Sequence, residues 1–356
     1  MGDHLLDVKN LSVDFHTTLG TVHAVRDVSW HLERGETLAI LGESGSGKSV
    51  SASAILNLID MPPGEITSGE ILFEGKDVLL MSAEDRRQLN GHRIAMIFQD
   101  PLSHLNPVYS IGFQIAETMT AHGVNKGQTR EKTIELLARV GIPDPDTKID
   151  AYPHQFSGGQ RQRIMIAMAL ALKPDILIAD EPTTALDVTV QAQILTLLEE
   201  LQEETGMGLL LITHDLGVVA EVADRVVVMN AGQIVETGTA SGVYHSPQHP
   251  YTKKLIAAIP GEGDMAEPLG SGAEPILEIS GLSKHYGAFV ALDDVSLTVL
   301  PGETVAIVGE SGSGKSTLAK TILRLEEATG GQALFQGQDL IRMDANALFK
   351  VRRDIQ

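Results

Sequence analysis

Two patterns of hydrophobic residues run through the first part of the chain. Apolar and polar residues alternate over 5–35 and 69–75, which predicts antiparallel strands with one buried face. Short continuous apolar runs predict strands that are buried on both faces, as in a parallel sheet. These runs are 37–41, 94–98, 176–179 and 209–213. Apolar residues at helical spacing over 110–140, 161–172 and 188–201 predict amphipathic helices, so we expect an α/β fold.

The opening pattern returns after a stretch of different composition. Residues 260–275 are rich in Gly, Pro and acidic residues, which predicts a flexible linker. Beyond this stretch, 295–316 parallels 28–49 with an offset of 309 − 42 = 267 residues, which fits a duplicated domain. The prediction is a complete domain with a C-terminal tail, then a linker, then the first part of a second copy. Their bounds are 1–259 with the tail at about 240–259, 260–275, and 276–356.

The composition excludes several kinds of site and partner. The chain has no Cys, which excludes disulfides, thiolate metal sites and a cysteine-ligated iron–sulfur cluster. A formal net charge of -20 argues against a nucleic-acid partner, because such partners normally meet a basic face. The start has no basic-then-apolar signal pattern, and the longest apolar run, 164–172, is shorter than the ~20 residues that span a bilayer. We expect a cytosolic or membrane-peripheral protein.

A glycine-rich turn follows the apolar run 37–41 and leads into a predicted helix. Its residues 42–49, Gly-Glu-Ser-Gly-Ser-Gly-Lys-Ser, form the phosphate-loop pattern between strand and helix, and the same eight return at 309–316. Glycines let backbone N–H groups approach phosphates, while Lys48 can reach the β- and γ-phosphates and Ser49 can bind Mg²⁺. The predicted ATP-binding residues are Gly42, Glu43, Ser44, Gly45, Ser46, Gly47, Lys48, Ser49 and Val50, then Gly309, Ser311, Gly312, Gly314, Lys315, Ser316 and Thr317.

Polar residues stand at the ends of three other buried runs in the first copy. Asp180 and Glu181 end one run, His214 follows a second, and Gln99 follows a third. Ligands bind at such strand ends in open α/β sheets. Mg²⁺ accepts a hydroxyl and a carboxylate, which fits Ser49 with Asp180, and Glu181 is the expected base that polarises water. We expect His214 to contact the γ-phosphate and Gln99 to touch water or metal.

In this order the motifs resemble those of the ATP-binding subunits of ABC transporters. Phe-Ser-Gly-Gly-Gln at 156–160 matches their signature motif and Asp-Glu-Pro at 180–182 matches the end of Walker B. Ala-Leu-Asp at 185–187 matches the D-loop and Thr-His-Asp at 213–215 the switch histidine. The resemblance covers essentially the whole chain. It implies a P-loop NTPase fold with a RecA-like core, an antiparallel β subdomain and a helical signature subdomain.

Three further stretches resemble the dipeptide and oligopeptide importer branch, which includes peptide, nickel and glutathione importers. They are Leu-Asn-Pro at 105–107, Tyr-Pro-His-Gln-Phe-Ser at 152–157 and His-Ser-Pro-Gln-His-Pro-Tyr-Thr at 245–252. This resemblance implies an ATP-hydrolysing motor subunit at the cytoplasmic face of the inner membrane. The implied partners are two membrane permease subunits, an extracytoplasmic solute-binding protein, and a second ABC ATPase domain that is fused or acts in trans.

The resemblance also implies roles for individual residues. Ser157, Gly158, Gly159, Gln160 and Asp187 would bind nucleotide held by an opposing domain. Phe15 in the first copy and Tyr286 in the second would stack on adenine, although Phe15 is equally a candidate core residue. The expected metal ligands are Ser49, Gln99, Asp180 and Ser316, and the expected catalytic set is Lys48, Gln99, Glu181 and His214.

The second copy is expected to be incomplete, because the chain ends before the counterpart of Gln99. Its run 304–308 should form a buried strand that lacks, as its neighbour, the strand carrying the Walker B acids, so the fragment should pack loosely. Because a complete site needs a signature turn from another domain, we expect the chain alone to be a poor ATPase.

Two other classes of function stay open at this stage. A soluble twin ATPase acting on ribosomes or DNA would want a basic linker or zinc-binding cysteines, and this linker is acidic. A regulatory chain without catalysis would be unaffected by Glu181→Gln.

Overall fold

The structure is a computed structural model that describes residues 4–184, 186–258, 274–310 and 312–355. The chain divides into two compact units, the first formed by Met1–Leu186 and Val190–Gly263 and the second containing Asp264–Gln356. Apart from its last two residues, the predicted linker lies outside the described residues. The predicted domain bounds therefore stay predictions.

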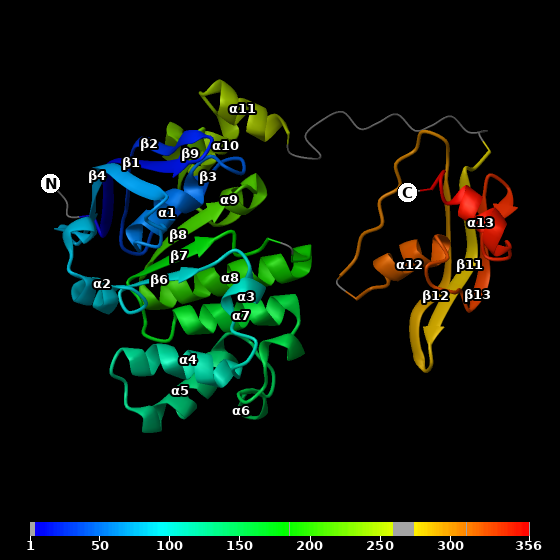
Figure 1. Ribbon diagram of the computed structural model, residues 1–356, viewed down its shortest axis with the longest axis horizontal. Helices are drawn as coiled ribbons and strands as arrows, with labels where there is room; N and C mark the ends of the chain where they lie inside the picture. The colour runs from blue at the N-terminus through cyan, green and yellow to red at the C-terminus, as the bar shows by residue number, and fades with distance from the viewer. Residues whose placement is uncertain (1–3, 185, 259–273, 311, 356) are drawn as a thin grey trace. The chain divides into compact units, whose positions relative to one another are not determined.

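An antiparallel sheet opens the first unit, as the alternating pattern predicts. Its strands are β1 (Leu6–Thr17), β2 (Gly20–Leu32), β4 (Gly64–Phe73) and β5 (Lys76–Asp77), in the order β2-β1-β4-β5. Inward-facing residues such as Leu6, Val8 and Leu11 are fully buried, while the residues between them are more exposed. Figure 1 shows β1, β2 and β4 in the upper part of the first unit.

The larger sheet has the order β10-β9-β3-β8-β7-β6. Its strands are β3 (Thr37–Leu41), β6 (Ile94–Ile97), β7 (Ile176–Asp180), β8 (Gly208–Thr213), β9 (Arg225–Asn230) and β10 (Gln233–Thr239). Strands β3, β6, β7, β8 and β9 run parallel to one another, and β10 is antiparallel to β9. Every residue of β3, β7 and β8 is buried, which confirms the continuous apolar runs as strands covered on both faces.

One predicted adjacency is wrong. We expected the phosphate-loop strand to lie beside the strand that carries Asp180 and Glu181. In the structure β3 pairs with β8 and β9, and β7 lies beyond β8. Helical crossovers join parallel strands, so the order along the chain does not set the order in the sheet.

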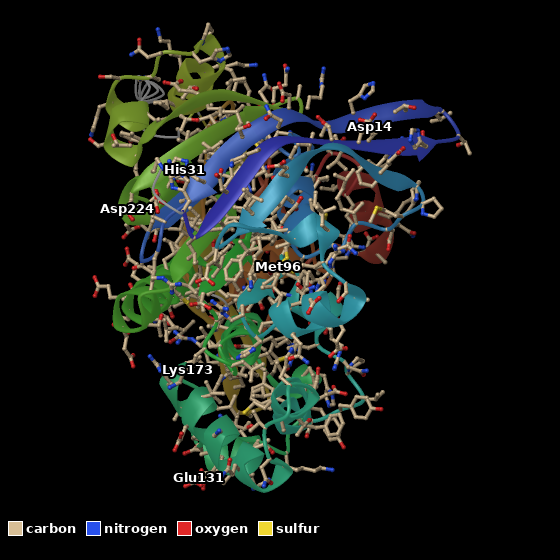
Figure 2. All side chains as sticks on the ribbon, turned by 90° about the vertical axis from the view of Figure 1, so that its left-hand side faces the viewer. Asp14, His31, Met96, Glu131, Lys173 and Asp224 are labelled. Carbon is tan, nitrogen blue, oxygen red and sulfur yellow. The ribbon has the colours of Figure 1, made fainter. Side chains whose placement is uncertain are left out.

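Helices cover both faces and one end of this sheet. The longer helices are α1 (Lys48–Ile55), α4 (Ile111–Ala121), α5 (Lys126–Arg139), α7 (Gly158–Ala169), α8 (Val188–Thr205) and α11 (Pro250–Ala257). The shorter ones are α2 (Ala83–Leu89), α3 (Pro101–His104), α6 (Pro145–Lys148), α9 (Leu216–Val222) and α10 (Ala240–His245). In Figure 2 the hairpin with Asp14 and helix α5 with Glu131 lie at opposite ends of the first unit.

Two helix predictions need adjustment. The pattern over 110–140 forms two helices, α4 and α5, with Gly123 at φ +85° between them. The helix expected at 161–172 begins at Gly158 instead and ends at Ala169. The earlier start follows from Ser157, whose Oγ caps the helix, so the signature turn is itself the first helical turn.

Buried hydrophobic residues form separate clusters in the described part of the first unit. One lies between the two sheets and includes Trp30 and Ile40. A second joins the larger sheet to helices α4, α5 and α7, and a third places Leu41 beneath α9, α10 and α11. No helix in the described ranges is both long enough and apolar enough to cross a membrane.

The second unit repeats the antiparallel sheet of the first. Strands β11 (Leu277–Tyr286), β12 (Phe289–Val299), β13 (Gly330–Phe335) and β14 (Gln338–Asp339) take the order β12-β11-β13-β14, with helices α12 (Lys315–Ile322) and α13 (Ala345–Val351). Leu282 pairs with Val295 as Leu11 pairs with Val28. The repeated register supports the duplication read from the sequence.

The buried strand predicted at 304–308 is wrong. These residues form no strand, and each of them is exposed, with Ile307 at 46% and Val308 at 88%. The physical reason is that no other strand of the described second unit pairs with them. The small core of this unit instead gathers around Leu282, Leu318 and Leu348.

Candidate nucleotide site

Strand β3 delivers the first phosphate loop at its C-terminal end. Gly45 and Gly47 take φ angles of +79° and +99°, a conformation that residues with a Cβ rarely adopt. A Cβ on Gly42 would lie 2.3 Å from the carbonyl oxygen of Met229, so the close packing excludes a larger residue. The backbone of the loop therefore requires glycine at these positions, and its contact with phosphate stays a prediction.

Lys48 lies inside this loop and is only 4% exposed. Its Nζ donates to the carbonyl oxygens of Gly42 at 2.8 Å and Glu43 at 2.9 Å. Burial lowers the pKa of Lys48, and the nearby carboxylates of Glu181 and Asp180 oppose that shift. The buried Ser46 hydroxyl has no hydrogen-bond partner in the described structure. A buried ammonium and an unpaired hydroxyl in one loop fit an anionic group such as a phosphate.

Asp180 comes to this loop from the end of β7. Its Oδ1 accepts a hydrogen bond from Ser49 Oγ at 2.9 Å, so the two predicted metal ligands are in contact. Burial raises the pKa of Asp180, helped by the Glu181 charge and opposed by the Ser49 hydrogen bond and Lys48. A hydroxyl and a desolvated carboxylate side by side are an oxygen donor set that suits Mg²⁺.

Three side chains converge on the carboxylate of Glu181, which is 13% exposed. Gln99 Nε2 donates to Oε2 at 2.7 Å, and His214 Nδ1 lies 3.1 Å from Oε1. Thr184 Oγ1 donates to Oε2 at 3.0 Å. The backbone N–H of Glu181 donates to Ile212 of β8 at 2.8 Å, which ties the acid to the strand that carries His214. The fold thus brings Gln99 and His214, which are 82 and 33 positions away in sequence, to the same carboxylate.

Sequence reasoning missed two residues that belong to this site. Thr184 stands three residues after Glu181, and a hydroxyl at that spacing after a strand-end acid is a local signal that could have found it. Tyr251 has no such local signal. Its hydroxyl oxygen accepts a hydrogen bond from the backbone N–H of Glu43 at 3.1 Å, and the two residues are 208 positions apart. Only the folded chain shows that contact.

The signature turn is ordered by its own hydrogen bonds. Ser157 Oγ accepts from the N–H of Gln160 at 3.3 Å, and Gln160 Oε1 accepts from the N–H of Ser157 at 3.1 Å. A Cβ on Gly159 would lie 2.5 Å from Val190 Cγ1 at the start of α8, and one on Gly158 would touch Leu186. The turn therefore packs against the segment that holds the predicted D-loop. Asp187 directly precedes α8, and Ala185 lies outside the described residues.

The aromatic candidates differ in their surroundings. Phe15 is half-buried and packs against the cluster between the two sheets. Tyr286 is 45% exposed, with Lys284 Nζ 4.7 Å from its ring centroid. Val50 packs against the same cluster as Phe15. Adenine stacking by either aromatic stays a prediction.

The second phosphate loop keeps the local geometry of the first. Lys315 Nζ donates to Gly309 at 2.7 Å and to Glu310 at 2.6 Å, as Lys48 does to Gly42 and Glu43. Gly314 takes φ +95°, but Lys315 is half-buried and Ser316 is exposed. Ser311 lies outside the described residues. No carboxylate in the described second unit hydrogen-bonds Ser316 as Asp180 does Ser49.

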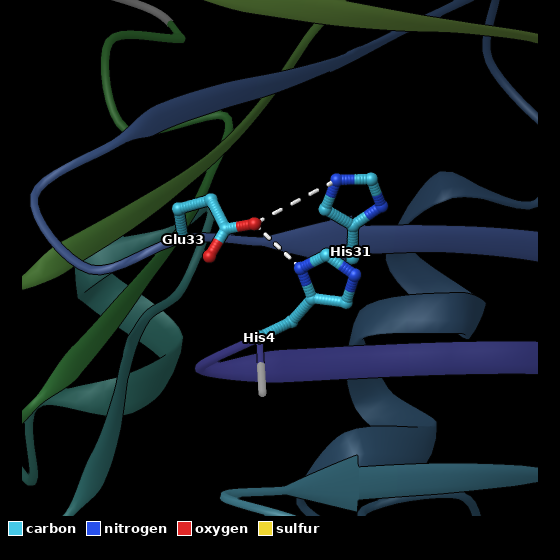
Figure 3. Close-up of side chains that lie close together, drawn as sticks. All are labelled: His4, His31 and Glu33. Carbon is cyan, nitrogen blue, oxygen red and sulfur yellow. Dashed lines mark hydrogen bonds and ion pairs between the residues drawn. The ribbon is translucent and has the colours of Figure 1, made fainter. Parts of the chain in front are cut away.

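A different cluster, His4, His31 and Glu33, lies near the start of the chain (Figure 3). Its ligand-type atoms lie within 4.8 Å of one another, and the two imidazole rings stack with centroids 3.9 Å apart. However, Arg225 Nη1 lies 2.7 Å from His31 Nε2, the atom that would face a metal. The guanidinium occupies that lone pair and repels a cation, so we interpret the cluster as a hydrogen-bonded surface group.

Comparisons with known proteins agree with this geometry. The sequence matches the family described as ABC transporter over residues 25–184 and 292–355, more than half of the chain. It is 44% identical to the glutathione import ATP-binding protein GsiA of Salmonella typhimurium, over 99% of this chain and 63% of that protein. The protein of the same name from Escherichia coli (strain K12) shows the same identity and coverage. The chain thus spans less than two thirds of the length of these relatives.

Solved structures also resemble the chain, among them those of MJ0796 and cbiO1. The dimeric post-hydrolysis structure of the ATP-binding cassette MJ0796, bound to ADP and Pi, has a TM-score of 0.59 at 26% identity and covers 66% of this chain and 98% of its own. The structure of cbiO1 from Clostridium perfringens, part of the ABC transporter complex cbiONQ, has the same TM-score at 30% identity and covers 73% and 97%. The phosphate loop, the acids that face it and these matches together show that the chain belongs to the ABC transporter family.

Proposed function

We propose that the first unit binds Mg²⁺·ATP and hydrolyses it as the motor subunit of an importer for peptide-type solutes such as glutathione. The observation that carries this proposal is the meeting of three parts at one edge of the larger sheet. These are the phosphate loop with buried Lys48, the Ser49–Asp180 pair, and the Glu181 carboxylate with its three partners.

Each group has a role in breaking the β–γ phosphate bond. Lys48 and the loop N–H groups neutralise the phosphate oxygens. Glu181 accepts a proton from the attacking water, and His214 and Gln99 orient that carboxylate and the γ-phosphate. Lys48 must leave the carbonyls of Gly42 and Glu43 to reach a phosphate, which is a short movement of one flexible side chain.

Ser49 and Asp180 are the residues that would hold Mg²⁺, with Gln99 as a third candidate. The metal would supply positive charge across the β- and γ-phosphates. The burial that raises the pKa of Asp180 fits this role, because a bound cation would offset the desolvation of its carboxylate.

The first site needs a signature turn from another ABC domain to be complete. Ser157, Gly159 and the N-terminus of α7 supply donors that would meet a γ-phosphate only across a domain interface. The relative MJ0796 forms a dimer with ADP and Pi, which supports a shared site. Pairing of two first units, head to tail, would make specific turnover rise with protein concentration, and a constant specific turnover would contradict it.

Exposed apolar side chains in and around helices α3 and α4 support docking to membrane permeases. They are Leu102, Val108, Tyr109, Phe113 and Tyr152, which are 43–70% exposed. Tyr109 and Phe113 stack with ring centroids 4.7 Å apart. An exposed aromatic pair of this kind is a candidate contact for a protein partner. The first four of the exposed side chains follow Gln99 closely in sequence, so a docked partner would sense the site through the Gln99–Glu181 hydrogen bond.

The solute and the remaining partners follow from the relatives by similarity. Two relatives are named glutathione import ATP-binding proteins. We therefore propose peptide-like solutes, two permease subunits, an extracytoplasmic solute-binding protein and a second ABC ATPase domain as the assembly. The chain would lie at the cytoplasmic face of the cell membrane, where ATP is available.

The central test compares ATP hydrolysis by the whole chain and by Glu181→Gln. Loss of the general base should lower turnover by about 10²–10⁴-fold while ATP binding persists. Glu200→Gln, on the exposed face of α8, is the matched control and should hydrolyse at the parental rate. Equal turnover in Glu181→Gln and the parent would contradict the proposed role of Glu181 and favour a regulatory chain.

A further inference from the structure

The tail motif at 245–252 has no role in the chemistry described so far, yet it is tied firmly to the larger sheet. Glu236 of β10 accepts hydrogen bonds from the backbone N–H groups of Gln248 at 2.7 Å and His249 at 3.0 Å. His249 Nδ1 in turn accepts from the N–H of Tyr251 at 3.2 Å and caps helix α11. These bonds fix where α11 begins and which way Tyr251 points.

The ring and the hydroxyl of Tyr251 do different things. The ring packs against the cluster that contains Leu41, the last residue of β3. The hydroxyl oxygen accepts the backbone N–H of Glu43 at 3.1 Å. Burial raises the pKa of Tyr251, so the phenol stays neutral at physiological pH. The tail thus reaches the first variable residue of the phosphate loop.

Glu43 is a junction within that loop. Its N–H is bonded to Tyr251, while its carbonyl oxygen accepts from Lys48 Nζ at 2.9 Å and from the N–H of Ser46 at 3.2 Å. The Tyr251 hydrogen bond thus restrains the Glu43 backbone, whose carbonyl oxygen bonds to Lys48. Ordering a loop before its ligand arrives lowers the entropic cost of binding.

We propose that Tyr251 is a positioning residue that holds the phosphate loop ready for nucleotide through the Tyr251–Glu43 hydrogen bond. The inference rests on the proposed ATP binding by this loop. It gives the 245–252 motif a role inside the cytoplasmic motor rather than at the solute or the permease.

The first measurement needs no nucleotide. In the whole chain, Tyr251→Phe keeps the ring in its cluster and removes only the acceptor of the Glu43 N–H. Amide hydrogen exchange at Glu43 should speed up by roughly two- to tenfold, the range for one neutral hydrogen bond. Exchange at Ala39 in β3 should not change. An unchanged rate at Glu43 would overturn the proposal.

The second measurement uses ATP. Tyr251→Phe should raise the Kd for ATP by roughly two- to tenfold, while turnover at saturating ATP and the Tm stay near parental values. A general loss of structure would instead lower the Tm and turnover together. Lys253→Ala, an exposed neighbour on α11, is the matched control and should leave the Kd unchanged.

A parental Kd in Tyr251→Phe would overturn the positioning role. Glu236→Ala, which frees the turn before α11, should reproduce the weaker Kd, and adding Tyr251→Phe to it should weaken binding little further. If the parent itself binds no ATP, the proposed function fails. The Glu43 exchange comparison would still decide whether Tyr251 holds the loop.

Discussion

The chain contains the same eight-residue phosphate loop twice, and the two copies differ in what surrounds them. Both lysines bond to the carbonyl oxygens of the loop's first two residues, and both helices begin after a glycine near φ +95° to +99°. Yet Lys48 is 4% exposed and follows a fully buried strand, whereas 303–310, the described residues just before the second loop's helix, form no strand. Local sequence sets the shape of the loop, and distant strands set its burial.

The largest expected effect concerns an isoleucine at the same position before each loop. Ile40 is fully buried in β3, and Ile307 is 46% exposed. Ile40→Ala should cost the first unit about 2–5 kcal/mol of stability, while Ile307→Ala should change the second by at most about 0.5 kcal/mol. Trp30, the single Trp of the chain, reports urea unfolding of the first unit, and amide exchange in β11 and β12 reports the second. Equal costs would break the comparison.

The lysines give the next contrast. Lys48→Ala should lower ATP turnover by about 10²–10³-fold, because it removes one preorganised donor from a site with acids beside it. Lys315→Ala should leave turnover within about twofold, since no carboxylate of the described second unit bonds to its loop. Steady-state hydrolysis of both variants is the measurement. A large loss in Lys315→Ala would show that the second loop also takes part in turnover.

The glycines before the lysines should behave alike. A Cβ on Gly47 would lie 2.4 Å from the Ala24 carbonyl oxygen, and one on Gly314 would lie 2.5 Å from that of Ala291. Replacement by Ala should therefore cost each loop about 1–3 kcal/mol, seen as faster amide exchange in α1 and α12. A cost in only one copy would mean that the surroundings, not the local sequence, shape the loop.

The smallest effect concerns the buried carboxylate of Asp180 beside the first loop. Because burial raises the pKa of Asp180, its ionised form opposes folding at neutral pH. Asp180→Asn should raise the Tm of the chain at pH 7 without Mg²⁺. The gain should shrink as pH falls through the raised folded-state pKa and vanish below 3.8, where Asp180 is protonated in both states. A gain that persists at low pH would assign it to packing instead.

Some of this structure could be predicted from sequence because its causes are local. The alternation over 5–35, the glycines of 42–49 and the strand-end acid Asp180 each act within a few residues. Two errors, the place of β7 and the strand at 304–308, share another cause. Both depend on which strands pair across long separations, and the apolar pattern of a strand does not name its neighbour.

The same reasoning explains which site residues were found. Gln99, Glu181 and His214 each stand at the end of an apolar run, and they meet because parallel strands end at one edge. Tyr251 stands on a helix far along the chain, and nothing in its neighbourhood points toward Glu43. Contacts made by a tail that folds back onto the sheet appear only in three dimensions.

The capping hydroxyl of Ser157 can accept one hydrogen bond and donate another. Its lone pair accepts the Gln160 N–H and so holds the first turn of α7 in place. Accepting that bond leaves the hydroxyl proton available to be donated outward. The hydrogen bonds between Ser157 and Gln160 order the turn within the chain itself, and in the proposed function a γ-phosphate that docks on it would meet a hydroxyl whose oxygen is already held in place. Phosphate recognition at this turn would then require little rearrangement of the turn itself.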